Sequence, residues 1–314
     1  MLKNFYKKLI IMLKKAFFLL LIPAAVLLFT GCGGCSGNKT NEDDLSVVSD
    51  DFDGPLQLGE DIMGSVIQNI SSPVEMANMI KSSSVGFSQR ILNNPDNVSK
   101  YETSFKKALN LGVFSSDLGY INIFDKNNIV VSYLMAAKTL ADGIRVGQFF
   151  DYEALRNVAT NSSNLETLME MSISSFNKIE NYLREQNRSE VSTLIITGAW
   201  IEGMYLSAKV YQEAKKKEMA DRIAEQKHVV EILEIVLDNY KSQPNFPMLV
   251  EGISELNKAY SSIRITIEYG EPKRIEREGT LLVVQDEIST AEYTEDDINK
   301  IIDIIIDIRS KVVE

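Results

Sequence analysis

The sequence is poor in the residues from which most catalytic and metal sites are built. Among 314 residues there is one histidine, His228, and there are two cysteines, Cys32 and Cys35. A histidine-rich metal site is therefore excluded, and any nucleophile activated by histidine would have to use His228. Because His228 lies in the charged helical stretch IAEQKHVV, we expect it to be exposed to solvent or packed at a helix edge.

Several sequence motifs that are typical of enzymes are also missing. The chain has no glycine-rich phosphate loop, no Gly-x-Ser-x-Gly and no His-Glu-x-x-His. Acidic residues outnumber basic ones, 44 against 33, so the net charge is −11 and phosphate backbones are repelled. We therefore expect no enzymatic activity, no cofactor, no bound metal and no nucleic-acid partner.

The first 31 residues have the pattern of a secretory signal peptide. They contain five lysines and no acidic residue, and the apolar run 16–29 follows the lysines. That run is too short to span a bilayer, which needs about 20 residues. A basic segment followed by a short apolar run is typical of a signal peptide, and Met12 offers an alternative start that would leave the same mature chain.

The apolar run ends in the residues LFTGC, with Cys32 as the cysteine. This ending resembles the lipobox of bacterial lipoproteins, in which the cysteine is acylated and becomes the first residue of the mature protein. The resemblance implies a diacylglyceryl group on Cys32, commonly with an added N-acyl chain such as palmitate, and hence attachment to a membrane. Cys32-Gly-Gly-Cys35 could alternatively be a redox pair or half of a metal site, but its position beside the signal favours lipidation.

Residues 32–59 are predicted to form a flexible acidic tether. Removal of residues 1–31 leaves 28 basic and 44 acidic residues, a mature charge of 28 − 44 = −16. Within the tether, Ser49 to Glu60 nearly matches a calcium-binding EF-hand loop, with Asp51, Asp53 and Gly54 at matching positions. Because Ser49 replaces the first aspartate and no amphipathic helix precedes it, a solvated linker is the favoured interpretation.

Residues 60–314 are predicted to be all-α: an antiparallel multi-helix bundle with one small β-hairpin near the C-terminus. Capping patterns at 72–75, 163–166 and 294–297 predict helix starts. In the hairpin, residues 263–269 alternate in polarity and precede the apolar run 281–284. The expected helices cover 60–70, 73–92, 99–124, 129–146, 151–160, 164–185, 189–213, 217–240, 247–261 and 295–312.

Three acidic residues, Asp117, Asp142 and Glu202, lie in otherwise apolar helical stretches. A tyrosine follows two of them at a spacing of three residues, on the same helical face. One hypothesis is a ligand pocket inside the bundle, lined by Asp117, Tyr120, Asp142, Trp200, Glu202 and Tyr205. The favoured alternative is that the acids pair with Lys138, Arg145 or tyrosine hydroxyls and fix the helix register, with Trp200 in the core.

Four stretches, SSPVEMANMIK, KKALNLGVFSSDLGYINIF, LADGIRVGQFFD and TGAWIEGMYL, resemble uncharacterised lipoproteins of the Bacteroidota. The resemblance implies a helical body anchored in the outer membrane, on its periplasmic or surface-exposed face, and no known activity. We expect a lipid-anchored, non-enzymatic binding or scaffold module whose partner is a small ligand or another envelope protein. The alternatives are a structural spacer of an envelope complex and a carboxylate-dependent envelope hydrolase.

Overall fold

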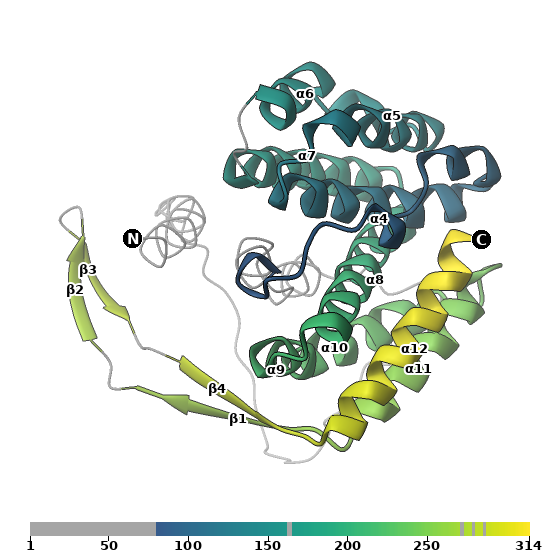
Figure 1. Ribbon diagram of the computed structural model, residues 1–314. Coiled ribbons are helices and arrows are strands. Elements are labelled where there is room, and N and C mark those ends of the chain that lie inside the picture. Colours follow the sequence, from purple (N-terminus) through teal and green to yellow (C-terminus); the bar gives the residue numbers. More distant parts are fainter. Residues whose placement is uncertain (1–79, 162–164, 271–272, 278–279, 285–286) are drawn as a thin grey trace, which may run out of the picture. The chain divides into compact units, whose positions relative to one another are not determined.

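The computed structural model describes residues 80–161, 165–270, 273–277, 280–284 and 287–314. The predicted signal peptide, Cys32, the acidic tether, the EF-hand-like loop and the first predicted helix lie outside these residues. The described part is a helical bundle with a small antiparallel β element near the C-terminus, which confirms the predicted fold class (Figure 1). Within it, no helix combines the length and the apolar content that crossing a membrane requires.

The helices mostly follow the predicted ranges. The short 3-10 helices are η1 (Gln89–Ile91), η2 (Pro95–Lys100) and η3 (Gly147–Phe149). The α-helices are α4 (Ser104–Ile123), α5 (Asn127–Gly143), α6 (Tyr152–Asn161), α7 (Leu165–Glu185), α8 (Ser189–Ala214), α9 (Lys217–Glu225), α10 (Lys227–Asp238), α11 (Phe246–Tyr260) and α12 (Glu295–Val313). The capping box at the start of α12 is confirmed: the Asp297 N–H donates to Thr294 Oγ1, and the Thr294 N–H donates to Asp297 Oδ2.

Two predicted helices are interrupted. The helix expected over 73–92 ends near Ser83, whose hydroxyl donates to Ile80 O at 2.6 Å and accepts from Val85 N–H at 3.1 Å. Serine hydroxyls compete in this way with the helical hydrogen bonds, and Ser84 takes a positive φ of 66°. The helix expected over 217–240 divides at Gln226, between α9 and α10.

The β element differs from the predicted hairpin in its pairing. Strand β1 (Arg264–Tyr269) pairs with β4 (Glu287–Glu292), while β2 (Lys273–Arg277) pairs with β3 (Thr280–Val284), both antiparallel. The predicted pairing of 263–269 with 281–284 is therefore wrong. The charged sequence KRIER of β2 and the weakly apolar sequence EISTAE of β4 give little strand signal, which is why both strands were missed.

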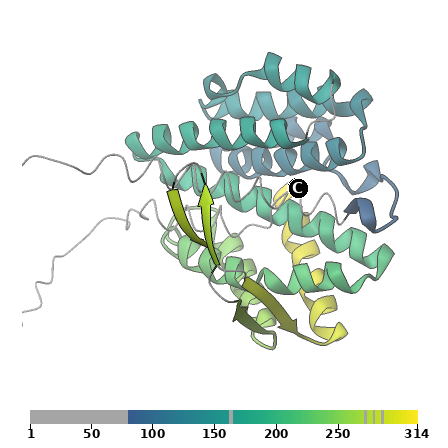
Figure 2. The ribbon, with the colours of Figure 1, turned by 90° about the vertical axis from the view of Figure 1, so that its left-hand side faces the viewer.

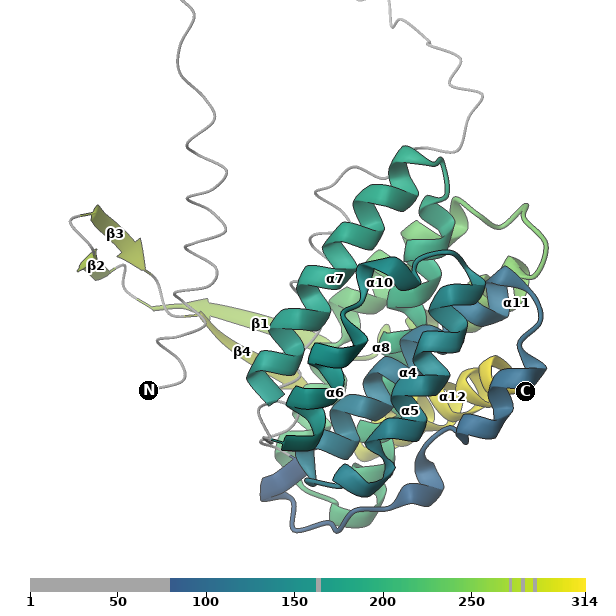
Figure 3. The same ribbon diagram turned by 90° about the horizontal axis from the view of Figure 1, so that it is seen from above.

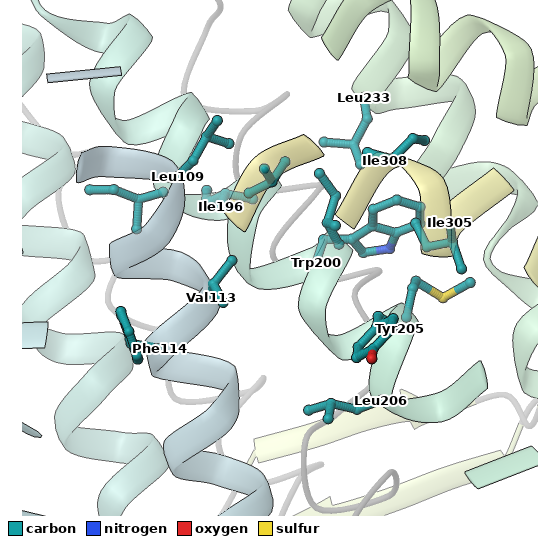
Figure 4. Packing of buried hydrophobic residues seen from close by; sticks show 14 of the residues in the cluster. Leu109, Val113, Phe114, Ile196, Trp200, Tyr205, Leu206, Leu233, Ile305 and Ile308 are labelled. Atoms are coloured by element: carbon teal, nitrogen blue, oxygen red, sulfur yellow. The ribbon is translucent and has the colours of Figure 1, made fainter. Parts of the chain in front are cut away.

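Helix α8 is the centre of the bundle. Figures 1 and 2 show α4 to α7 in one half of the body and α9 to α12 in the other, with α8 running between them. Helix α4 packs against α5 and against α8 (Figure 3). In the close view of Figure 4, Trp200 of α8 lies beside Ile305 of α12, and both side chains are buried.

The backbones of α4 and α8 touch at two glycines. A Cβ added to Gly112 would lie 2.1 Å from Ile195 O, and one added to Gly198 would lie 2.0 Å from Leu109 O. Ser116 also donates to Ala199 O at 2.8 Å across the same crossing. Because both obstructing atoms belong to the backbone, no rotamer change can make room for a larger residue.

We predict that Gly198→Ala lowers the free energy of unfolding by about 2 kcal/mol or more, because the added methyl forces the helices apart. Gly203→Ala in the same helix is the matched control, since nothing lies within 4 Å of its Cβ position. Removing an interior helical glycine there should raise stability by up to about 1 kcal/mol. Thermal or urea unfolding followed by circular dichroism would measure both; equal effects of the two variants would contradict the proposed backbone contact.

Candidate functional site

An ion pair inside the bundle joins α8 to α12. Arg309 Nε donates to Glu202 Oε2 at 2.9 Å, and Arg309 Nη2 donates to Glu202 Oε1 at 3.1 Å. The Glu202 side chain is 0% exposed and that of Arg309 is 13% exposed. Two parallel hydrogen bonds between the planar guanidinium and the carboxylate fix both side chains, so the pair sets the position of α12 on α8.

A second acid, Asp117 of α4, lies against this pair. Its side chain is fully buried, and its Oδ2 accepts from the backbone N–H of Asn93 at 3.1 Å. Its Oδ1 is buried without a hydrogen-bond partner, and the carboxyl lies close enough to that of Glu202 for the two charges to interact. Two ionised carboxylates buried side by side would repel each other, so a proton on one of them is favoured.

The surroundings decide which acid holds that proton. Burial, followed by repulsion from Glu202, raises the pKa of Asp117 well above its usual range. Burial also raises the pKa of Glu202, but attraction to Arg309 opposes that change. Burial and repulsion therefore favour the neutral form of Asp117, whereas Glu202 is the charged member that pairs with Arg309.

Arg309 is held by two further contacts. Its guanidinium carbon lies 4.4 Å from the centre of the Tyr205 ring, in cation–π geometry. Its Nη2 is 3.4 Å from Ile91 O, in the short helix η1. Although burial opposes the charged form, attraction to Glu202 leaves the pKa of Arg309 raised, so the guanidinium stays charged.

A network of neutral polar groups extends from the acids to the end of α12. The side-chain amide of Asn93 donates to Tyr101 Oη at 3.0 Å and to Asn110 Oδ1 at 3.3 Å. Tyr101 donates in turn to Val313 O at 3.1 Å, and Asn110 donates to Val312 O at 2.9 Å. The last carbonyls of a helix have no partner within the helix, and here α4 and the segment before it provide the donors.

Three of the six residues predicted to line one pocket come together. Asp117 and Glu202 are in contact, and Tyr205 covers the arginine that pairs with Glu202. The pocket hypothesis is wrong for Asp142, whose side chain is 51% exposed and pairs with Lys138 at 2.6 Å. That pairing is the one that the alternative interpretation named.

The other two predicted residues serve elsewhere in the core. Trp200 is buried, and its Nε1–H donates to Gln226 Oε1 at 3.1 Å, at the break between α9 and α10. Tyr120 is also buried; its hydroxyl accepts from Ser88 N–H at 3.3 Å, and its ring packs on that of Phe87. Both therefore hold loops or helix junctions in place.

Sequence reasoning missed Arg309, Asn93, Tyr101 and Asn110. Arg309 had a recognisable signal: in α12 it is four residues after Ile305 and three before Val312, both on the apolar stripe. A cation beside such a stripe is a natural partner for an acid in an apolar helix. The three neutral residues had no comparable signal, because asparagine and tyrosine are common at surfaces.

The remaining chemistry of the described residues is sparse. His228 is 72% exposed and lies 3.0 Å from Glu231, so it is a solvated histidine as expected. Across the described part of the chain, no three His, Cys, Asp or Glu residues are grouped closely enough to hold a metal ion. The neutral Asp117 and charged Glu202 could in principle act as acid and base, but both are inaccessible to a substrate.

Comparisons of the chain with protein-family models, with curated proteins and with solved structures find no match. The functional argument therefore depends on the residues of this chain alone.

We predict opposite consequences for the two acids. Glu202→Gln leaves the buried Arg309 without a charged partner and should cost about 3 to 5 kcal/mol of unfolding free energy. Asp117→Asn should cost far less, because the amide is neutral, as the protonated acid is, and its Oδ1 can accept from the Asn93 N–H. Urea unfolding at pH 7 would measure both; a larger loss for Asp117→Asn would contradict the assignment of the proton.

The same two proteins test the assignment through pH. A raised folded-state pKa means that the folded state keeps its proton while the unfolded state loses it, so stability falls as pH rises above about 4. Over the pH range in which Asp117 is protonated in the folded state and ionised in the unfolded state, it lowers the free energy of unfolding by about 1.4 kcal/mol per pH unit. Asp117→Asn removes this slope, so its stability relative to the unmodified chain should increase from pH 4 to pH 7.

Proposed function

We propose that the protein is a lipid-anchored cell-envelope protein that acts as a non-enzymatic binding or scaffold module. The observation that carries this proposal is the complete burial of Asp117 and Glu202, the two acids that share the bundle interior. Both are used to join α4, α8 and α12 through Arg309. These two interior acids therefore hold the helices of the bundle together.

A carboxylate-dependent hydrolase is disfavoured for the same reason. A general acid or base must reach the substrate within hydrogen-bond distance, directly or through one water. Glycosidases also need their two carboxyls on either side of the scissile bond, about 5 Å or more apart, and not in mutual contact. The exposed Asp142 is paired with Lys138, which is an ordinary surface contact.

The envelope location is proposed from the N-terminal sequence. A basic, apolar leader followed by LFTGC favours acylation of Cys32, and the acidic residues after it would hold the helical body away from the membrane. Two or more acyl chains are enough for stable anchoring, whereas a single chain binds only marginally. We propose the outer membrane as its location, with the periplasmic and the exterior face both open.

We predict that Cys32→Ala releases the protein from the membrane fraction, because Cys32 is the cysteine that ends the lipobox-like sequence LFTGC. Cys35→Ala is the matched control, three residues away with the same chemical change, and should remain membrane-bound and extractable only with detergent. Cell fractionation with mass spectrometry of the mature N-terminus measures both. Release by both variants, or by neither, would count against anchoring through Cys32.

The non-enzymatic character has its own test. Replacing the ion pair with neutral residues, Glu202→Gln together with Arg309→Met, removes both charges and should change stability far less than Glu202→Gln alone. If Glu202 has only a structural role, the double variant should reverse the defect of a strain from which the gene for this protein has been deleted. A double variant that folds normally by circular dichroism but fails to restore the strain would indicate a chemical role for Glu202.

A further inference from the structure

Strand β3 presents an unusual edge. It is one of two strands in its sheet, so β2 occupies one of its edges and no described strand pairs with the other. Its sequence is TLLVV, in which every residue after Thr280 is apolar. Edge strands of stable proteins normally bear lysine, proline or a bulge that prevents pairing with another chain, and β3 has none of these.

The sequence of β3 is complementary to itself in antiparallel pairing. If two copies of β3 pair about Leu282, Leu281 lies opposite Val283 of the other copy, and Thr280 lies opposite Val284. Every cross-strand pair is then apolar or nearly so, and no like charges are opposed.

The edge of β2 does not have this property. Pairing of two β2 strands about Ile275 would place Lys273 opposite Arg277 of the other copy, and this like-charge pair occurs twice. Like charges directly opposite one another destabilise a strand pair. The same register places Arg274 opposite Glu276, also twice, so attraction offsets that repulsion, but β2 lacks the apolar pairs that β3 offers.

Strands β1 and β4, which lie next to the helical body, are also poorly suited to pairing with a second copy of themselves. Two β4 strands paired about Ser289 and Thr290 would oppose Glu287 and Glu292. Two β1 strands paired about Thr266 and Ile267 would oppose Ile265 and Glu268, an apolar residue with a charged one. Of the four strands, β3 alone matches a second copy of itself.

The distribution of charge along the chain is also compatible with association through the segment that contains β3. The whole chain has a net charge of −11, so two bodies repel each other. Residues 264–284 contain four basic residues (Arg264, Lys273, Arg274 and Arg277) and four acidic ones (Glu268, Glu271, Glu276 and Glu278), which is a net charge of zero. Residues 264–284 therefore add no net charge of their own to this repulsion.

We propose that β3 pairs antiparallel with β3 of a second copy of this chain, giving a four-stranded sheet in the order β2, β3, β3, β2 and a two-fold symmetric dimer. The pairing adds backbone hydrogen bonds to a two-stranded ribbon, which by itself is marginally stable in water. This inference goes beyond the proposed function and does not depend on it.

Disulfide trapping tests the register as well as the association. In the full chain with Cys35→Ser, Leu282→Cys places two cysteines opposite each other on the two-fold axis, within the 4.4 to 6.8 Å Cα separation that a disulfide needs. The matched control is Ile275→Cys, because Ile275 is the β2 partner of Leu282. In the proposed sheet two copies of residue 275 are three strand spacings apart, about 14 Å.

We expect mild oxidation of the purified full chain to give a dimer with Leu282→Cys at least about tenfold more abundantly than with Ile275→Cys, because only the first pair meets disulfide geometry. The chain with Cys35→Ser alone measures any cross-link through Cys32. Adding Val283→Lys to Leu282→Cys should suppress the dimer, while the unchanged helical circular dichroism shows that the body is folded. Absence of the Leu282→Cys dimer, equal cross-linking at position 275, or cross-linking to a protein of another mass would each overturn the proposal.

Discussion

The contact between the backbones of α4 and α8 is the constraint on which the rest of the body depends. At Gly112 and Gly198 no side chain separates the two helices. About one turn further along each helix, this close approach brings Asp117 and Glu202 together in the bundle interior. Two buried carboxyls in contact cannot both be charged at a tolerable cost, so the crossing imposes a need for one proton and one cation.

Helix α12 supplies the cation that the buried carboxyls need, and this requirement helps to determine where α12 lies. Arg309 neutralises Glu202, while Asn110 and Tyr101 bind the carbonyls at the end of the same helix. The apolar stripe of α12 provides the burial, but a stripe alone tolerates sliding and rotation. The two-pronged ion pair fixes the register of α12, so packing and electrostatics specify a single arrangement together.

The sequence predicted most helices because their signals are local, as at Thr294, where the cap and the apolar period agree. It failed where a few polar side chains redirect the backbone, as at Ser83. Asp117 and Glu202 were recognisable as charges within apolar helices, but Asp142 has similar neighbours and lies at the exposed end of α5. Arg309 could not be assigned to Glu202 from spacing, because 107 residues separate them.

That separation has a consequence for how the body is made. A chain emerging from the ribosome presents Glu202 before Arg309, the cation that pairs with it among the described residues, has been synthesised. At a typical 5 to 20 residues per second, the 107 intervening residues take roughly 5 to 20 s. Until then, closing α4 on α8 requires Glu202 to be buried either as an uncompensated charge or in its protonated form. The arrival of α12 is therefore the step that allows Glu202 to be buried in its charged form.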